Sequence, residues 1–292
     1  MRIGIIGAGK VGTTMGKYVS CHGGSVSGFY SRTAVSAKEA AEFSGTGYFD
    51  NMDSLIEASD TLFIATVDEA VAGVWDCIAK KNVKGKVVCH FSGSLSSDVF
   101  SNWSETGAYV CSLHPIYAFS NKFTSYQNLT EAMFAVEGCE EALVRMRSLF
   151  ALLPNRVITI DTAQKAKYHA ALSVASNQVV GLIYMAVEMI KETGITEETA
   201  YAMLGPLVQN NIKSVFAGED GQAAGCAQAL TGPVERNDCG TVLRHLASLS
   251  GSRWENPYRS MGSVLTELAG KKNPGRDYRQ MQGLWQRKSM ED

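Results

Sequence analysis

The first half of the chain alternates between two kinds of hydrophobic pattern. Short runs rich in β-branched and aromatic residues predict strands, and the longer stretches between them carry apolar residues at helical spacing. Strands that alternate with helices of this length predict a parallel, doubly wound sheet, because parallel neighbours need a crossover connection. The predicted strands are Ile3–Ile6, Ser25–Tyr30, Thr61–Ala65, Val87–Phe91, Tyr109–Leu113, Met133–Val136 and Val157–Ile160, the last two extending the sheet. The predicted helices include Lys10–Cys21, Ala34–Phe43, Asp68–Lys80 and Glu140–Leu152.

The pattern changes after Asp161, where no further strand is predicted and helical periodicity continues to the end. A long helix is predicted over Thr162–Glu192, and another begins near Glu197. The chain has 292 residues, which exceeds the usual size of one domain. We therefore predict an α/β domain over residues 1–161 and an all-α domain over residues 162–292. Two further helices are expected at Thr241–Leu249 and Tyr258–Ala269.

Composition and charge narrow the class of protein. Hydrophobic residues make up 45% of the chain and charged residues 19%, as in an ordinary globular protein. A net charge of −2 argues against a nucleic-acid binder, because phosphate contacts normally require a basic surface. The first residues lack the features of a signal peptide, and no apolar stretch approaches the ~20 residues of a membrane span. We expect neither nucleic acid nor a membrane as a partner.

Seven cysteines are spread along the chain without a Cys-x-x-Cys pair or a cluster at metal-ligand spacing. An odd number without a disulfide framework fits a reducing compartment, where a thiol inside a strand behaves as a small hydrophobe. We therefore expect a cytoplasmic protein without a metal site.

A glycine-rich motif joins the first predicted strand to the first predicted helix. Its first glycine permits a tight turn, the second lets the backbone approach a pyrophosphate, and the third lets helix and strand pack closely. The helix that follows offers free N–H groups and a partial positive charge to phosphates. The residues expected to bind a dinucleotide here are Gly7, Ala8, Gly9, Lys10, Val11 and Gly12.

The end of the second strand indicates which dinucleotide binds. NAD sites usually carry Asp or Glu about 20 residues after the glycines, where it bonds the ribose 2′-hydroxyl. Residues 1–38 contain no acidic residue, and Ser31, Arg32 and Thr33 stand where the 2′-phosphate of NADP would arrive. The alternative is that Arg32 is a solvated loop arginine. We predict NADP, with Thr66 after the third strand as a further contact.

Polar side chains also follow two neighbouring strands. Ser92 comes directly after the strand that ends at Phe91, and His114 follows the next strand. Ligands of open α/β sheets bind at the carboxyl ends of the strands, so we expect both residues beside the nicotinamide or the substrate. A structural role beside Pro115 is the alternative for His114. For His90, inside its strand, a buried structural role is at least as well supported.

A row of polar residues at a spacing of four opens the helical domain. On an α-helix such a row drifts by only ~40° per step and makes one polar stripe. Its neighbours are small or apolar, which predicts a helix packed on most sides and a stripe that needs partners or a cleft. The stripe either bonds the other domain or supplies a proton donor and groups that orient a substrate. The row consists of Lys165, His169, Ser173 and Asn177.

A further polar segment, Leu230–Asp238, contains a rigid Thr-Gly-Pro turn. Arg236 is suited to holding a carboxylate in bidentate fashion, and Asp238 is a second candidate for substrate contact. The two residues could equally form a structural ion pair.

These segments resemble, across nearly the whole chain, the Rossmann-like proteins with a C-terminal domain of unknown function. The matching motifs are GAGKVG, HFSGSL, SLHPIYAF, FAVEG, KAKYHAALSVASN, LTGPVERND and TVLRHL. That group is similar to pyrroline-5-carboxylate reductases, ketopantoate reductases and 3-hydroxyacid dehydrogenases. The resemblance implies a Rossmann domain followed by a helical domain like the C-terminal domain of 6-phosphogluconate dehydrogenase. It also implies an NADPH-dependent oxidoreductase.

The resemblance extends to site residues. In the hydroxyacid dehydrogenases a helix-borne lysine is the proton donor, and an asparagine four residues later binds substrate. Lys165 matches the lysine, whereas His169 stands at the asparagine position, so these two are implied as the catalytic residues. Some members of the group reduce ketopantoate, which makes a small 2-oxo acid, ketopantoate first, the implied substrate. The expected substrate contacts are Ser92, His114, Ser173, Asn177, Arg236 and Asp238.

Two other functions fit the same residues. An imine reductase of the pyrroline-5-carboxylate type would also hold a carboxylate, but it would depend less on a strong proton donor, because an imine can arrive protonated. A non-catalytic NADP sensor would use the glycine motif and would have no need of Lys165 and His169 facing the nicotinamide.

The long predicted helix also bears on assembly. The second half of Thr162–Glu192 carries more apolar side chains than one small domain readily covers. We therefore expect a homodimer built mainly through the helical domain.

Overall fold

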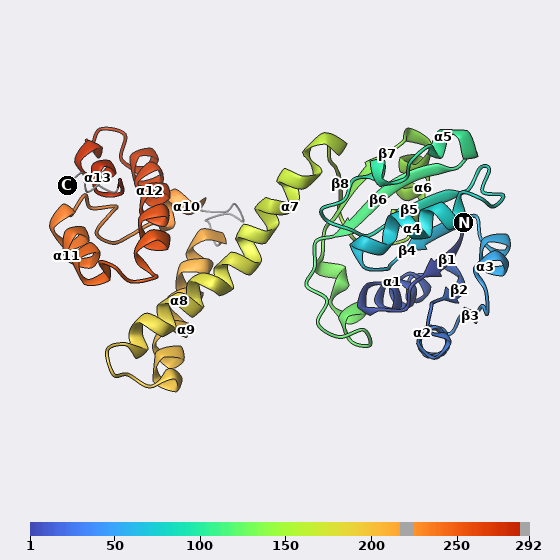
Figure 1. Cartoon of the computed structure of the whole chain (residues 1–292), viewed down its shortest axis with the longest axis horizontal. Coiled ribbons are helices and arrows are strands. Elements are labelled where there is room, and N and C mark those ends of the chain that lie inside the picture. The colour runs from blue at the N-terminus through green and yellow to red at the C-terminus, as the bar shows by residue number, and fades with distance from the viewer. Residues whose placement is uncertain (217–224, 287–292) are drawn as a thin grey trace. The chain divides into compact units, whose positions relative to one another are not determined.

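The computed structural model describes residues 1–216 and 225–286, and the chain divides into two compact units, Met1–Ala175 and Ser176–Asp292 (Figure 1). The division falls after helix α7 (Lys165–Ser173) and not at residue 161, because the buried side chain of Lys165 anchors the start of α7 in the first unit.

One eight-stranded sheet, of order β3-β2-β1-β4-β5-β6-β7-β8, forms the centre of the first unit (Figure 1). All neighbouring strands are parallel except β6 and β7, which are antiparallel. The predicted doubly wound sheet and its extension by two strands are confirmed, whereas the two-residue β3 is too short to show a pattern in the sequence. The strands are β1 Arg2–Ile6, β2 Ser25–Tyr30, β3 Gly47–Tyr48, β4 Thr61–Ile64, β5 Val87–His90, β6 Tyr109–Pro115, β7 Phe134–Gly138 and β8 Val157–Thr159.

The two faces of the sheet carry separate hydrophobic cores. Strand side chains alternate between them, so that Ile5 and Phe63 pack on one face while Ile6 and Leu62 pack on the other. The first core lies under α1 Lys10–Cys21, α2 Ala34–Ser44 and α6 Glu140–Phe150. The second lies under α3 Met52–Ala58, α4 Asp68–Ile78 and the short α5 Trp103–Thr106. This double cover holds the carboxyl ends of β1, β4, β5 and β6 at one edge, where ligands of such sheets bind.

The long helix predicted over Thr162–Glu192 is present with one irregularity. It begins as a 3-10 turn at Thr162–Gln164 and continues as α7, and a π-helical turn at Val174–Gln178 leads into α8 (Val179–Lys191). The prediction that its first part is packed on most sides is wrong, because Lys165 is the only buried residue of α7. The expectation that no apolar stretch reaches membrane-spanning length also needs correction, since Thr162–Lys191 passes by length and composition. Within the described chain, 6% of the apolar window of this segment is buried.

The described part of the second unit is helical and contains no strand, as predicted. Its small core combines Val242 and Leu246 with Ala269, Met281 and Trp285. Besides α8, its helices are α9 Glu197–Phe216, α10 Gly225–Ala229, α11 Cys239–Leu249, α12 Glu255–Lys272 and α13 Arg279–Leu284.

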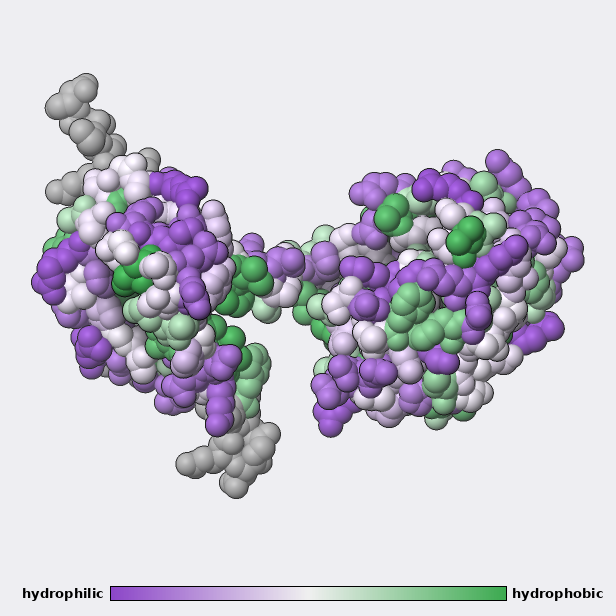
Figure 2. Space-filling model, turned by 90° about the horizontal axis from the view of Figure 1, so that it is seen from below, coloured by the Kyte–Doolittle hydropathy of each residue, from purple (hydrophilic) through white to green (hydrophobic). Residues whose placement is uncertain are grey.

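Helices α8 and α9 expose an apolar surface. Val187 is the only buried residue of α8 and Ala200 the only one of α9. Figure 2, where hydrophobic residues are green, shows apolar side chains on the surface of both units. The exposed large apolar residues of α8 and α9 are Val180, Leu182, Tyr184, Tyr201, Met203, Leu207, Ile212 and Phe216.

Candidate active site

The glycine-rich turn between β1 and α1 has the geometry that each glycine was expected to provide. Gly7 has a φ of 108°, and a Cβ there would lie 2.6 Å from the carbonyl oxygen of Ala65. A Cβ on Gly12 would collide with the Gly7 carbonyl, so this glycine allows the close approach of helix and strand. Gly9 faces open space directly before α1, whose first N–H groups are therefore accessible. The turn can admit a pyrophosphate at the N-terminus of α1.

The loop after β2 offers donors for which the described residues provide no hydrogen-bond acceptor. The side chains of Arg32 and Thr33 are exposed, and Ser31 is half-buried. Thr33 caps α2 through its backbone only, without a side-chain hydrogen bond. The Thr66 hydroxyl, just beyond β4, is buried and has no hydrogen-bond partner among the described residues. These free groups fit a phosphorylated dinucleotide whose ribose end lies at β2 and whose pyrophosphate lies near Gly7.

At the end of β5, His90 has a structural role. Its ring is fully buried, its Nδ1 accepts a hydrogen bond from the Ser92 N–H at 3.1 Å, and its Nε2 donates to the Ser96 carbonyl oxygen at 3.2 Å. Burial lowers the pKa of His90 to about 4, so the ring is neutral. Both ring nitrogens are thus engaged by backbone groups, as a buried structural role for His90 requires.

Ser92 holds the loop between β5 and the following turn. Its hydroxyl donates to the Asp68 carboxylate at 2.6 Å and accepts hydrogen bonds from the backbone N–H groups of Ser94 and Leu95 at 3.1 and 2.9 Å. Asp68 lies in the first turn of α4, where the helix dipole favours a carboxylate. Ser92 thus lies at the expected edge of the sheet, and its hydroxyl is hydrogen-bonded to Asp68 and to the backbone of its own loop.

Three polar side chains meet above Gly93, and we call them the imidazole cluster: His114, Tyr168 and His169. His114 Nδ1 lies 3.0 Å from the Tyr168 hydroxyl, and the two imidazole rings stand edge to face with centroids 5.9 Å apart. A Cβ on Gly93 would lie 2.8 Å from His114 Nε2 and 2.9 Å from His169 Nε2. Only glycine at this position lets both ring nitrogens approach the end of β5.

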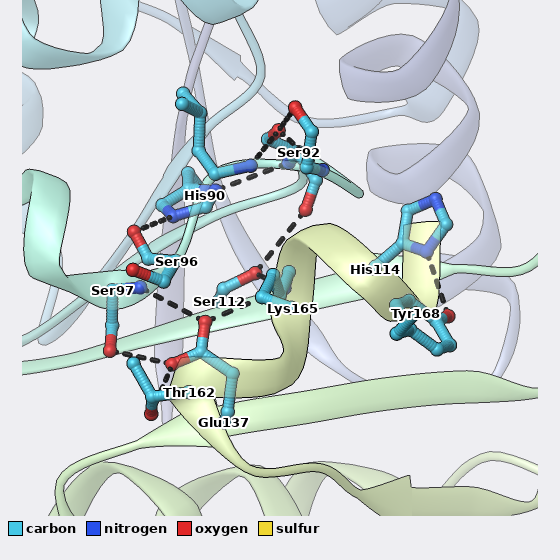
Figure 3. A network of polar contacts seen from close by, with 12 residues as sticks. His90, Ser92, Ser96, Ser97, Ser112, His114, Glu137, Thr162, Lys165 and Tyr168 are labelled. Atoms are coloured by element: carbon cyan, nitrogen blue, oxygen red, sulfur yellow. Dashed lines mark hydrogen bonds and ion pairs between the residues drawn. The ribbon is translucent and has the colours of Figure 1, made fainter. Parts of the chain in front are cut away.

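A second polar group, the lysine cluster, lies one turn earlier on α7 and consists of Lys165, Glu137, Ser112, Ser97 and Thr162 (Figure 3). The Lys165 ammonium donates to the Ser112 hydroxyl and to the Glu137 carboxylate, the latter at 3.5 Å. Glu137 also accepts the Ser97 N–H at 2.9 Å, the Ser97 hydroxyl at 2.7 Å and the Thr162 hydroxyl at 3.0 Å. Both charged side chains are 1% exposed.

Burial is the first cause acting on Lys165. It lowers the lysine pKa, and the nearby Glu137 carboxylate opposes that shift. Because Glu137 accepts four hydrogen bonds from three elements, the cluster ties α7 to β6, to β7 and to the 3-10 turn Ser97–Val99. Lys165 and Glu137 form a buried ion pair, and the remaining lone pairs of the carboxylate accept hydrogen bonds from Ser97 and Thr162.

The other predicted residues lie apart from these two clusters or in the second unit. Ser173 ends α7 and is half-buried, and Asn177 is exposed in the π-helical turn. Asp238 caps α11 by accepting the Thr241 N–H at 2.9 Å, and this hydrogen bonding to Thr241 is the main cause of its lowered pKa. Arg236 is exposed and contributes least to that shift. Capping explains Asp238 without a ligand.

Sequence reasoning missed Glu137, Tyr168 and Gly93. A single acid inside the apolar strand FAVEG was a usable signal, because a buried carboxylate needs a partner. Tyr168 lies outside the spacing of four that defined the polar stripe, and nothing local shows that Gly93 faces two imidazoles. These contacts join residues that are far apart in the chain.

Two family models match the chain: a Rossmann-like domain over residues 1–115 and the domain of unknown function DUF2520 over residues 132–264. No curated protein matches it. The second model begins before β7 and therefore includes Glu137 as well as α7.

Several solved structures share the fold. A protein of Thermotoga maritima has a TM-score of 0.71 at 22% identity, covering 92% of this chain and 99% of that one. A protein of Bacteroides fragilis, provisionally named an NADP oxidoreductase, has a TM-score of 0.63 at 23% identity, covering 94% and 98%. An imine reductase of a Pseudomonas species has a TM-score of 0.60 at 14% identity, covering 92% and 97%. The first part of the chain thus matches a Rossmann-like domain, the second part matches DUF2520, and the fold is shared with these solved structures.

Proposed function

We propose that this protein is an NADPH-dependent oxidoreductase that reduces a polarised double bond in a small molecule. The observation that carries the proposal is the imidazole cluster. His114 and His169 converge on Gly93 at the same edge of the sheet that carries the glycine-rich turn. A binding protein that only senses a dinucleotide has no need of such a group at the ends of β5 and β6.

The first unit has the residues to hold the cofactor. The N-terminus of α1 would bind the pyrophosphate through free N–H groups, with Gly9 leaving room for its approach. Ser31 and Arg32 would bind the 2′-phosphate, for which a guanidinium is a planar charged donor. When bound, NADPH would supply a hydride.

Reduction also requires a proton, because hydride addition to a carbonyl leaves an alkoxide. Of the two donors expected from the sequence, His169 belongs to the imidazole cluster and faces Gly93. Lys165 is held by Ser112 and Glu137, so direct donation would require its ammonium to leave both partners. We therefore propose that the proton comes from the imidazole cluster and that Lys165 supports it.

A small 2-oxo acid, with ketopantoate first, is the substrate class that we propose. It rests on the resemblance of the sequence motifs, with Asn177 and Arg236 as proposed substrate contacts. An imine is the second candidate, because an imine reductase shares the fold over 92% of this chain. A non-catalytic sensor is the third candidate and differs from both by having no turnover.

A substrate panel separates these three functions. The oxidation of NADPH would be followed with ketopantoate, other 2-oxo acids and cyclic imines that carry a carboxylate. We expect turnover with at least one 2-oxo acid, whereas turnover with imines alone would indicate the second function. Tight NADPH binding without turnover on any compound would indicate a sensor and overturn the proposal.

We further propose a cytoplasmic homodimer assembled through the helical unit. Val180, Leu207 and Phe216 of α8 and α9 are 67%, 58% and 74% exposed, more apolar surface than a soluble monomer usually leaves open on one pair of helices. Sedimentation should give twice the mass of one chain at micromolar concentration, and Leu207→Asp should shift it toward the monomer. A wild-type monomer at that concentration would contradict the proposal.

A further inference from the structure

The two nitrogens of the His114 ring face different partners. Nδ1 lies 3.0 Å from the Tyr168 hydroxyl, while Nε2 points to Gly93 and the ring of His169. Among the described residues, His114 is the hydrogen-bond partner of the Tyr168 hydroxyl. The ring therefore bridges the phenol on one side and the space near Gly93 on the other.

The protonation states follow from burial. Burial raises the pKa of Tyr168 to about 12, so the phenol keeps its proton at neutral pH. Burial, followed by the charges of Lys165 and His169, lowers the pKa of His114 to about 4, so this ring is neutral. A protonated phenol beside a neutral imidazole donates to Nδ1, which assigns the remaining ring proton to Nε2.

The charged and titratable groups around His114 come from two helices, α7 and α4. Lys165 and His169 of α7 oppose protonation of the ring, whereas Asp68 of α4 favours it weakly, as the last of the causes acting on its pKa. Tyr168 of α7 contacts the ring directly. Lys165 is fixed by Glu137 and Ser112, so its charge stays near the ring without contacting the space near Gly93.

We propose that His114 Nε2–H protonates the atom that becomes negative during reduction, and that Tyr168 fixes the tautomer of His114 and replaces its proton. This assignment rests on the proposed reductase function. It moves the donor from the two residues implied by the resemblance, Lys165 and His169, to a strand histidine expected to contact substrate. His114 is then a catalytic residue, and Tyr168 is a positioning residue that also supplies a proton.

The step balances without a further reactant. Hydride adds to the carbon of the C=O or C=N bond, whose π electrons move to the oxygen or nitrogen, and NADPH is oxidised to NADP⁺. The oxygen or nitrogen takes the Nε2 proton, and His114 Nδ1 takes the phenol proton, so the ring stays neutral. After the product leaves, Nε2 takes a proton from water and Nδ1 returns its proton to the Tyr168 phenolate, which restores the Nε2–H ring and the neutral phenol. The direction is favourable because an alkoxide is a stronger base than a phenolate.

Two substitutions test the relay in the full chain. We expect Tyr168→Phe to lower kcat about 10- to 100-fold and His114→Asn to lower it about 10²- to 10⁴-fold, the range for a lost general acid, while the Kd for NADPH stays within about twofold. Tyr109→Phe is the matched control, because Tyr109 lies at the opposite end of the same strand, and it should leave kcat unchanged. Wild-type turnover in Tyr168→Phe would overturn the proposal.

The pH profile separates this donor from a charged imidazole. Neither Tyr168 nor His114 changes its resting proton between pH 6 and 9, so the wild-type kcat should be constant over that range. An imidazolium donor, with an ordinary pKa near 6.5, would instead make kcat fall tenfold per pH unit above neutrality. Such a fall, abolished by His169→Asn, would assign donation to His169 and overturn the proposal.

A spectroscopic measurement keeps the inference separate from the proposed function. NMR of the full chain with ¹⁵N-labelled histidine should show His114 as the neutral Nε2–H tautomer from pH 5.5 to 8, and Tyr168→Phe should mix the two tautomers. An Nδ1–H tautomer, or titration of His114 near pH 6.5, would overturn the relay even in an active enzyme. Absence of any turnover with the correct tautomer would instead overturn the proposed function, and with it the catalytic role of His114.

Discussion

Lys165 and His169 lie one turn apart on α7, yet their surroundings differ completely. The Lys165 side chain is 1% exposed and donates to Ser112 and Glu137, whereas His169 is half-buried and faces Gly93. A spacing of four residues places two side chains on one face of a helix, but the protein packed against each turn decides what they contact. In the lysine cluster the two charged groups pair with each other and are buried. In the imidazole cluster the ring nitrogens beside Gly93 are available to a ligand.

The largest expected effect that follows from this difference is on stability. Lys165→Met would leave the buried Glu137 carboxylate unpaired, which we expect to lower the free energy of unfolding by about 3–5 kcal/mol. His169→Asn, one turn later, should change it by less than about 1 kcal/mol. Urea unfolding of the full chain measures both variants under the same conditions.

The double variant Glu137→Gln/Lys165→Met sharpens the test. It removes both charges together and should therefore recover part of the stability lost in Lys165→Met. Lys165→Met could instead keep wild-type stability and NADPH affinity while kcat falls ~10²- to 10⁴-fold. In that case Lys165 is the donor that the resemblance implied, and the structural role given to the lysine cluster is wrong.

The part of the site that depends on local geometry could be predicted from the sequence. Gly7, Gly9 and Gly12 act within one strand–turn–helix unit, so their spacing alone describes the turn. The contact between Lys165 and Glu137 joins α7 to β7 across 28 positions, and no periodicity indicates it. The π-helical turn Val174–Gln178 likewise interrupts the regular spacing on which the polar stripe to Asn177 was based.

A second prediction compares two cations. Arg32 is exposed and makes no hydrogen bond or ion pair with the described residues, in contrast to the buried, paired Lys165. We expect Arg32→Ala to leave the stability nearly unchanged and to weaken NADPH binding roughly ten- to a hundredfold, or about 1.5–3 kcal/mol. NADH affinity should not change, because NADH has no 2′-phosphate. Fluorescence titration of both cofactors measures this, and equal affinities for them in the wild type would refute the NADP assignment.

The third prediction concerns two histidines with lowered pKa values. Burial holds both His90 and His114 near a pKa of about 4, below the ordinary value of 6.5. Between these values the unfolded chain binds more protons than the folded one, so stability is lost as the pH falls from 6.5 toward 4. The slope should approach about 1.4 kcal/mol per pH unit for each histidine.

Unfolding midpoints measured from pH 7 to 4 test this prediction. His114→Asn should make the pH dependence shallower by about half, since His90 would then act alone. An unchanged slope would show that His114 is not buried in its neutral form, and this would weaken the contrast between the imidazole cluster and the lysine cluster.

The most direct test of the central claim, that the chain transfers hydride from NADPH to a small molecule, is isotope transfer. The full chain would be incubated with NADPH deuterated at both positions of nicotinamide C4 and with each compound of the 2-oxo acid and imine panel, and the products analysed by mass spectrometry. We predict one deuterium on the reduced carbon of at least one product, formed about 10²- to 10⁴-fold more slowly by His114→Asn. Tight NADPH binding with no deuterium in any product would contradict the account and leave a dinucleotide-binding protein without reductase activity.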